Sequence, residues 1–241
     1  MHFTTLNKIM KKIFISLLIV SVFYGCSSDN ENLMTVKGTI DGLKKGTLYL
    51  QKIEDTLLIS IDSISLNGVN TFELETVVES PEIFYLTLNA TNAPERILFF
   101  GEPGLVTINS RFDRFDTSFK ISGGKNQQLL SKHQEMLRQF NDRQLELIER
   151  NFKATKAKNQ LLNAKVQSEY DQLIKRRYLY TTNYAVQNAD YEIAPYLALT
   201  DLYNANITLL DTINNSLSDK VRQSKYGKKL DEYIKNIKSA K

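Results

Sequence analysis

Residue types that commonly carry catalysis are scarce in this chain of 241 residues. It has one cysteine, Cys26, and two histidines, His2 and His133. A catalytic triad needs a histidine beside its nucleophile, and zinc sites without cysteine need several histidines. His2 falls in an N-terminal leader, and we expect His133 to be an exposed residue of the first predicted helix. We therefore assign no catalytic residue, no metal ligand and no cofactor, and predict that the chain is not an enzyme.

Cys26 ends a segment with the layout of a bacterial signal peptide. Three lysines and no acidic residue precede an apolar stretch, residues 13–22, and Gly25 stands directly before Cys26. The stretch is about half the roughly 20 residues that a membrane span needs. The pattern resembles a lipobox, in which the cysteine is acylated before residues 1–25 are removed. The alternative is a secreted protein with one unpaired cysteine.

Acylation of Cys26 has consequences for chemistry and location. The mature chain would have no thiol, which excludes disulfide and thiol redox chemistry. We expect the lipid to hold it in the cell envelope, at the outer membrane, on the periplasmic face or at the cell surface. Residues 26–32 are a polar, acidic tether, which resembles surface-export signals. The oligomeric state is left open.

Acidic side chains offer two pairs for acid–base or cation chemistry, Glu54-Asp55 and Asp113 with Asp116. Neither pair has the spacing of a calcium-binding loop, so we expect solvated turn residues. The run Ser122-Gly123-Gly124-Lys125 could present free helix amides to a phosphate. It lacks the spacing of a phosphate-binding loop and favours a hinge between sheet and helix, with Ser122 near the helix cap.

Arg176-Arg177-Tyr178, Tyr180 and Tyr184 mix basic and aromatic side chains, as glycan and single-strand nucleic-acid surfaces do. Their helical spacing favours packing of Arg177, Tyr180 and Tyr184 across a helical hairpin. Nucleic acid is not expected as a partner, because only 28 of the 31 basic residues, against all 27 acidic ones, follow residue 25. The mature formal charge is then +1.

Three tripeptides resemble O-glycosylation sites of exported proteins, and modification there is an open hypothesis. They are Asp55-Thr56-Leu57, Asp62-Ser63-Ile64 and Asp211-Thr212-Ile213.

The elements that would position these residues fall into two parts, which predicts an α+β fold. Residues 33–121 alternate apolar and polar side chains in short runs broken by Gly, Pro and Asn, which predicts seven or eight antiparallel strands in a sandwich or barrel. The turns between successive strands are too short for parallel crossovers.

Residues 125–241 have the apolar spacing of helices. A long helix should turn near residues 155–159 into an antiparallel return helix, which forms a hairpin. A cap of short helices follows, with Pro195 in a first turn, Ser218 as an N-cap and Gly227 before a last helix that ends near Ile237.

Several short runs in the β-rich part resemble the domain of unknown function 4369 family, found at the N-termini of envelope lipoproteins of Bacteroidota. The match is carried by the order of Val36-Lys37-Gly38-Thr39-Ile40, Gly46-Thr47-Leu48-Tyr49-Leu50, Asp62-Ser63-Ile64, Phe72-Glu73-Leu74, Ser80-Pro81, 98–104 and Ile121-Ser122-Gly123. The chain departs from the pattern at Thr76, where relatives often have glycine. Many members continue into a thioredoxin-like domain with a Cys-x-x-Cys motif, and no such motif occurs here.

Two main hypotheses follow from these observations. The first is a membrane-anchored, non-catalytic module that binds an envelope protein or a glycan. The second is an accessory to, or a truncated relative of, thiol-disulfide oxidoreductase lipoproteins. A hydrolase built on the β-rich part is a third possibility with less support, because no nucleophile and base are visible together.

Overall fold

The computed structural model describes residues 31–90 and 94–240, and residues 32–241 form one compact unit. Eight strands precede six helices within the described ranges. The strands are β1 (Leu33–Asp41), β2 (Lys45–Glu54), β3 (Leu57–Asn67), β4 (Thr71–Val77), β5 (Glu82–Asn89), β6 (Glu95–Gly101), β7 (Gly104–Arg111) and β8 (Lys120–Ser122). The helices are α2 (Lys125–Lys156), α3 (Gln160–Gln187), α4 (Ile193–Thr200), α5 (Ile207–Ser216), α6 (Asp219–Arg222) and α7 (Lys225–Ser239). The predicted α+β class is confirmed.

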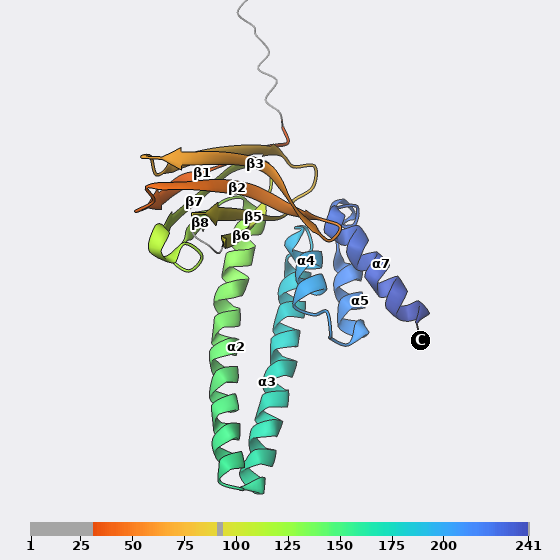
Figure 1. Cartoon of the computed structure of the whole chain (residues 1–241). Helices are drawn as coiled ribbons and strands as arrows, with labels where there is room; N and C mark the ends of the chain where they lie inside the picture. Colours follow the sequence, from red (N-terminus) through yellow and green to blue (C-terminus); the bar gives the residue numbers. More distant parts are fainter. Residues whose placement is uncertain (1–30, 91–93, 241) are drawn as a thin grey trace, which may run out of the picture. The chain divides into compact units, whose positions relative to one another are not determined.

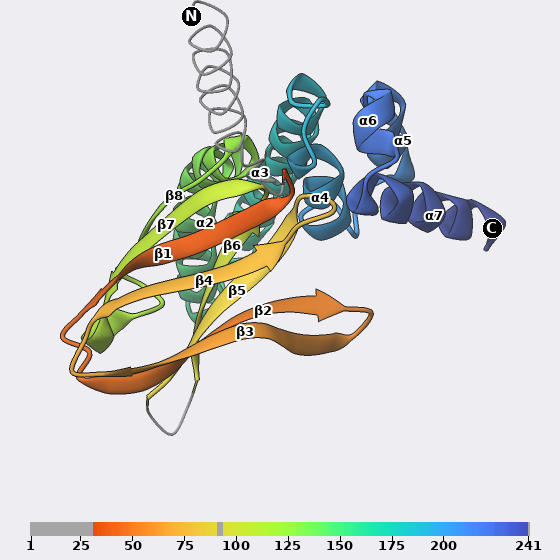
Figure 2. The same cartoon turned by 90° about the horizontal axis from the view of Figure 1, so that it is seen from above.

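Two four-stranded sheets pack face to face as a sandwich (Figures 1 and 2). Sheet A has the order β4-β1-β7-β8, and sheet B has the order β3-β2-β5-β6. Along β1, Met34, Val36 and Ile40 point inward and are fully buried, which is the period-two alternation of a strand with one face on the core. The core also includes Leu48, Leu50, Phe84, Leu86, Phe99 and Ile108.

The expectation of purely antiparallel pairing is wrong at one place, because β1 and β7 run parallel. Short turns exclude parallel pairing only between successive strands, and five strands separate β1 from β7. Gly38 lies at the centre of this pair. A Cβ atom at Gly38 would lie 1.7 Å from the carbonyl oxygen of Ile108, so only glycine permits this close approach of the two backbones.

The β5–β6 part of sheet B is buried on both faces, which makes it the wall between the sandwich and the helices. On β5, Phe84 and Leu86 face the sandwich core, whereas Ile83 packs with Phe100 and Leu130 against the helices. The run of buried side chains along β5 is therefore nearly continuous, as expected for a strand covered on both sides.

The entry into α2 is fixed by Glu102 rather than by Ser122. Gly124 is the N-cap, and the Glu102 carboxylate accepts hydrogen bonds from the backbone N–H of Asn126 at 3.2 Å and from its Nδ2 at 2.8 Å. Nδ2 of Asn126 also donates to Glu192 at 2.9 Å, and Oδ1 of Asn126 accepts from the N–H of Ile193 at 2.8 Å. One buried amide thus joins the sandwich, α2 and the start of α4.

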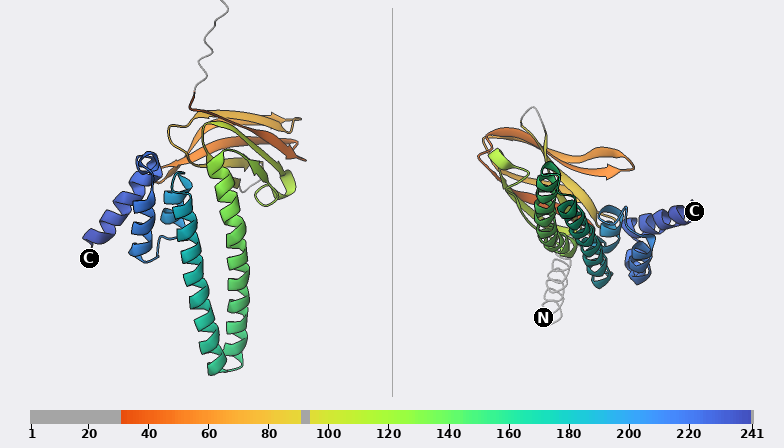
Figure 3. Two further views of the ribbon diagram at one scale, coloured as in Figure 1. Left: turned by 180° about the vertical axis from the view of Figure 1, so that it is seen from behind. Right: turned by 90° about the horizontal axis from the view of Figure 1, so that it is seen from below.

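Helices α2 and α3 form the predicted antiparallel hairpin, which extends away from the sandwich (Figures 1 and 3). Its own small core consists of Leu147, Val166 and Leu173. The turn lies where the sequence predicts it, and the side chain of Asn159 caps α3 by accepting from the N–H of Leu162 at 3.0 Å.

The short C-terminal helices pack around a separate apolar cluster that includes Ala185, Leu202, Leu210 and Leu230. Ser218 is the N-cap residue of α6, as predicted. No helix of the described ranges has both the length and the apolar character of a membrane span.

Candidate functional site

His133 is buried rather than exposed, so the expectation for this residue is wrong. Its side chain is 1% exposed, stacks with Tyr180 at 5.7 Å between ring centroids and lies 5.2 Å from the ring of Tyr184. Nε2 of His133 lies 3.2 Å from the hydroxyl of Thr181. Burial, and then the charge of Arg177, lower the pKa of His133 to about 4, so the ring is neutral at pH 7.

The Tyr180 and Tyr184 rings pack inside the hairpin as predicted, with centroids 5.9 Å apart. Arg177 is bonded to Asn141 across the hairpin, with Nη1 and Oδ1 3.5 Å apart. Together with His133, this cluster fills the space between α2 and α3, and its role is packing rather than presentation to a ligand.

The two carboxylate pairs lie in exposed positions. Asp55 occupies the β2–β3 turn with a φ of 53°, and Asp113 forms an ion pair with Arg111 at 3.0 Å. In the described ranges, no three His, Cys, Asp or Glu side chains converge as metal ligands would. The structure places neither pair in a cleft.

The N-terminus of α2 is already occupied by an anion of the protein itself. The Glu102 carboxylate bonds to Asn126 there, and a Cβ atom at Gly124 would lie 1.6 Å from Oε1 of Glu102. The prediction of a hinge without a phosphate site agrees with this contact. The N-cap is Gly124, so Ser122 lies near the cap as predicted.

The hydroxyl residues of the three glycosylation tripeptides are all exposed, and their modification stays a prediction. Thr56 and Ser63 are exposed. Thr212 is also exposed, although its hydroxyl donates to the carbonyl oxygen of Thr208 at 2.8 Å. Cys26, His2 and most of the predicted tether lie outside the described residues.

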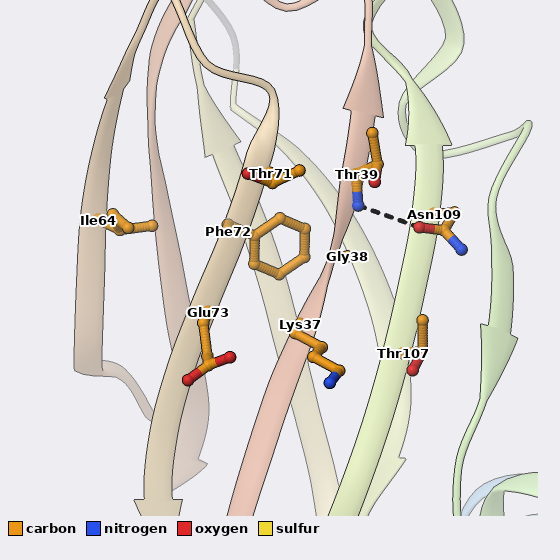
Figure 4. A pocket seen from close by; sticks show the side chains of 9 residues that line it. All are labelled: Lys37, Gly38, Thr39, Ile64, Thr71, Phe72, Glu73, Thr107 and Asn109. Carbon is orange, nitrogen blue, oxygen red and sulfur yellow. Dashed lines mark hydrogen bonds between the residues drawn. The ribbon is translucent and has the colours of Figure 1, made fainter.

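A shallow groove of about 470 Å³ crosses β7, β1 and β4 of sheet A and reaches Ile64 on β3 of sheet B (Figure 4). It is lined by Lys37, Gly38, Thr39, Ile64, Thr71, Phe72, Glu73, Thr107 and Asn109. Oδ1 of Asn109 accepts from the N–H of Thr39 at 3.0 Å, and Lys37 stands opposite Glu73 in the antiparallel register. This open surface combines hydroxyl, amide and charged groups with the apolar side chains of Ile64 and Phe72.

A smaller cleft lies where sheet B meets α4 and α7, and we call it the tyrosine cleft. Its volume is about 230 Å³, and its lining is Ile53, Glu82, Ile83, Tyr85, Tyr196, Thr200, Lys225, Tyr226 and Lys229. The three tyrosines come from β5, α4 and α7, which are far apart in the sequence. No local motif could have indicated this site, since only the packing of the helices on sheet B brings the tyrosines together.

The aromatic wall of the tyrosine cleft is held rigidly. The Tyr196 and Tyr226 rings lie 5.3 Å apart between centroids, and both contact the edge of Phe100. The Tyr226 hydroxyl accepts a hydrogen bond from the N–H of Ile83 at 3.1 Å, and the side chain of Tyr196 is hydrogen-bonded to that of Thr200. Burial, with Tyr85 adding to it, raises the pKa of Tyr196 to about 12, so its phenol is a neutral donor and acceptor.

The charges of the tyrosine cleft are unequal. Glu82 is ion-paired with Lys225 and lies 3.7 Å from Nζ of Lys52, so its charge is compensated. Lys229 is exposed and forms no ion pair with any carboxylate of the described residues. Among its described lining residues, the cleft therefore offers aromatic faces, tyrosine hydroxyls and the unpaired positive charge of Lys229.

Residues 34–130 match the model of the family described as Domain of unknown function (DUF4369). The resemblance to this family is thus confirmed for residues 34–130. The match covers all eight strands and ends at Leu130, early in α2. No curated protein matches the chain.

A solved structure described as pT26-6p is similar over 81% of this chain and 42% of its own, with 13% identity and a TM-score of 0.23. The chain thus spans less than half of the length of that protein, and the likeness carries no argument about fold or function.

Proposed function

We propose that this chain is a lipid-anchored protein of the cell envelope that binds a glycan in the tyrosine cleft without catalysing a reaction. The observation that carries the binding proposal is the meeting of three tyrosines and an unpaired lysine at the junction of two packed parts of the fold. Ligand sites favour such junctions, with apolar and aromatic walls and a few polar groups. A volume of about 230 Å³ suits one sugar ring.

The chemistry of the lining supports a sugar as ligand. The aromatic faces of Tyr85 and Tyr196 can pack against the apolar face of a sugar ring, while their hydroxyls bond to its hydroxyl groups. The free ammonium group of Lys229 favours a sugar with a carboxylate.

The same lining favours binding over hydrolysis. Glycoside hydrolysis uses two carboxyl groups about 5–9.5 Å apart. Among its described lining residues the cleft has one carboxylate, Glu82, and Lys225 and Lys52 already compensate its charge. Binding is therefore the activity that this lining supports.

Ligand-observed NMR on residues 32–241 tests the binding proposal. Saturation transfer to N-acetylmuramic acid should exceed transfer to uncharged N-acetylglucosamine, because only the first has a carboxylate for Lys229. The double variant Tyr85→Ala/Lys229→Gln should abolish the signal. The matched control Tyr203→Ala removes a tyrosine that is 55% exposed outside the cleft and should leave the signal unchanged. Equal transfer for the double variant and the control would rule out the cleft.

The location is tested separately, through Cys26. Labelling of cells with a palmitate analogue should mark the wild-type chain and not the Cys26→Ser variant, and the variant should leave the membrane fraction. Lipid labelling that persists in the variant would refute the anchor. That result would not bear on the tyrosine cleft, because the NMR experiment uses the chain without Cys26.

A further inference from the structure

We infer that the tip of the helical hairpin is a contact site for the headgroup region of an anionic phospholipid bilayer. The tip comprises residues 150–168, the end of α2, the turn and the start of α3. This segment contains five basic residues and no acidic one. The rest of the described chain has mixed charges, so the positive charge at the tip is local.

Three of the tip lysines form no ion pair with any described residue, although Lys165 contributes to the lowered pKa of Glu169. Arg150 is bonded to Glu169 at 2.7 Å, and Lys153 is bonded to Glu149. In contrast, no carboxylate of the described residues lies within ion-pair distance of Lys156, Lys158 or Lys165, which are all exposed.

Two large apolar side chains stand among these lysines. Phe152 is 69% exposed and Leu161 is 84% exposed, whereas Leu147 and Val166 of the hairpin core are buried. An alternative explanation of Lys153 and Lys156 is that cations in the last turn of a helix interact favourably with the helix dipole. Interaction with the helix dipole does not explain why Phe152 and Leu161 are exposed beside these lysines.

The combination has a known physical use at lipid surfaces. Apolar side chains enter the boundary between headgroups and acyl chains, while the flexible stems of lysines keep their charges among the phosphates. Attraction to anionic lipid amounts to about a five-fold gain in binding for each lysine. The lysines Lys156, Lys158 and Lys165 together should then contribute about a hundred-fold.

The hairpin gives this contact its reach. Helix α2 has 32 residues and is about 48 Å long at 1.5 Å per residue. The tip lies at the end of the hairpin that is far from the sandwich (Figures 1 and 3). The described chain begins at the sandwich, with β1. A bilayer held at the tip is thus separated from the sandwich by the length of the hairpin.

Vesicle co-sedimentation tests the inference with residues 32–241, which form a compact unit without the leader. Binding to vesicles of 30% phosphatidylglycerol in phosphatidylcholine should be strong at low salt, weak at 0.5 M salt, and absent for pure phosphatidylcholine. The variant K156Q/K158Q/K165Q should bind about a hundred-fold less. The control K44Q/K120Q/K228Q loses the same charge at exposed positions elsewhere and should bind like the wild type.

The apolar part is tested by Phe152→Ser/Leu161→Ser, which should weaken binding at least ten-fold while circular dichroism confirms an unchanged helix content. Equal binding of the two lysine variants, or equal binding to neutral and anionic vesicles, would overturn the inference. A second copy of the chain could also cover the tip. If analytical sedimentation showed that the wild type is a dimer and the serine variant a monomer, and vesicle binding of the variant were unchanged, the inference would likewise be overturned.

Discussion

Buried His133 should make the stability of the fold depend on pH below neutrality. Its ring is 1% exposed between Tyr180 and Tyr184, and its Nδ1 atom has no hydrogen-bond partner among the described residues. Burial and the charge of Arg177 lower its pKa from 6.5 to about 4. The Asp201 carboxylate lies 3.6 Å from Nδ1 of His133 and could stabilise a protonated ring. Burial raises the pKa of Asp201, however, which disfavours the charged carboxylate and weakens this stabilisation.

The sign of the effect follows from these values. A histidine whose pKa is lowered on folding binds its proton more readily in the unfolded chain. The contribution of buried, neutral His133 to the free energy of unfolding is therefore fully present above pH 6.5, and it is lost as the pH falls toward about 4. At pH 4.5 the loss amounts to roughly 2 kcal/mol of the free energy of unfolding.

Urea denaturation of the wild type and of His133→Gln at pH 7 and pH 4.5 measures this contribution. Glutamine does not titrate and can still bond to Thr181. Other titrating groups, including Asp201, are present in both proteins and largely cancel. The variant should be the less stable protein at pH 7, and the gap should shrink by about 2 kcal/mol at pH 4.5. A gap that is the same at both pH values would show that His133 is not held neutral by burial.

Two further substitutions test how the fold is joined. Gly38→Ala places a Cβ atom 1.7 Å from the carbonyl oxygen of Ile108. The free energy of unfolding, measured by urea denaturation, should fall by more than about 3 kcal/mol. A loss below about 1 kcal/mol would contradict the close approach of β1 and β7. Asn126→Ala removes the buried amide shared by Glu102 and Glu192, which should cost about 3 kcal/mol of the free energy of unfolding by urea denaturation. A loss below about 1 kcal/mol would argue against this role.

The strands and the hairpin could be predicted from the sequence because their signals are local. Alternation along β1 and the helical spacing along α2 each reflect one buried face. The hairpin turn follows from Asn159, whose side chain caps the next helix. The DUF4369 resemblance also depends on short runs in order along the chain, and residues 34–130 confirm it.

The remaining features depend on contacts between distant segments. The β1–β7 pair closes across five strands. The burial of His133 depends on Tyr180 and Tyr184 of α3 and on Asp201 beside α4. Gly227 was expected before the last helix but lies inside its first turn, because Ser224 is the N-cap and accepts from the N–H of Gly227 at 3.2 Å.

Sheet B explains why the family match extends beyond the strands. The last matched residue, Leu130, packs with Ile83 and Phe100 on the face of sheet B that is turned away from the sandwich core. The first turns of α2 help to bury Ile83 and Phe100, and full burial of one such side chain contributes about 1.5–3 kcal/mol. The start of α2 is thus part of what stabilises the DUF4369 domain. Helices α4 and α7 cover the same face of sheet B. The tyrosine cleft therefore lies on an apolar face of the sheet that must be shielded from water for the β-rich domain to be stable.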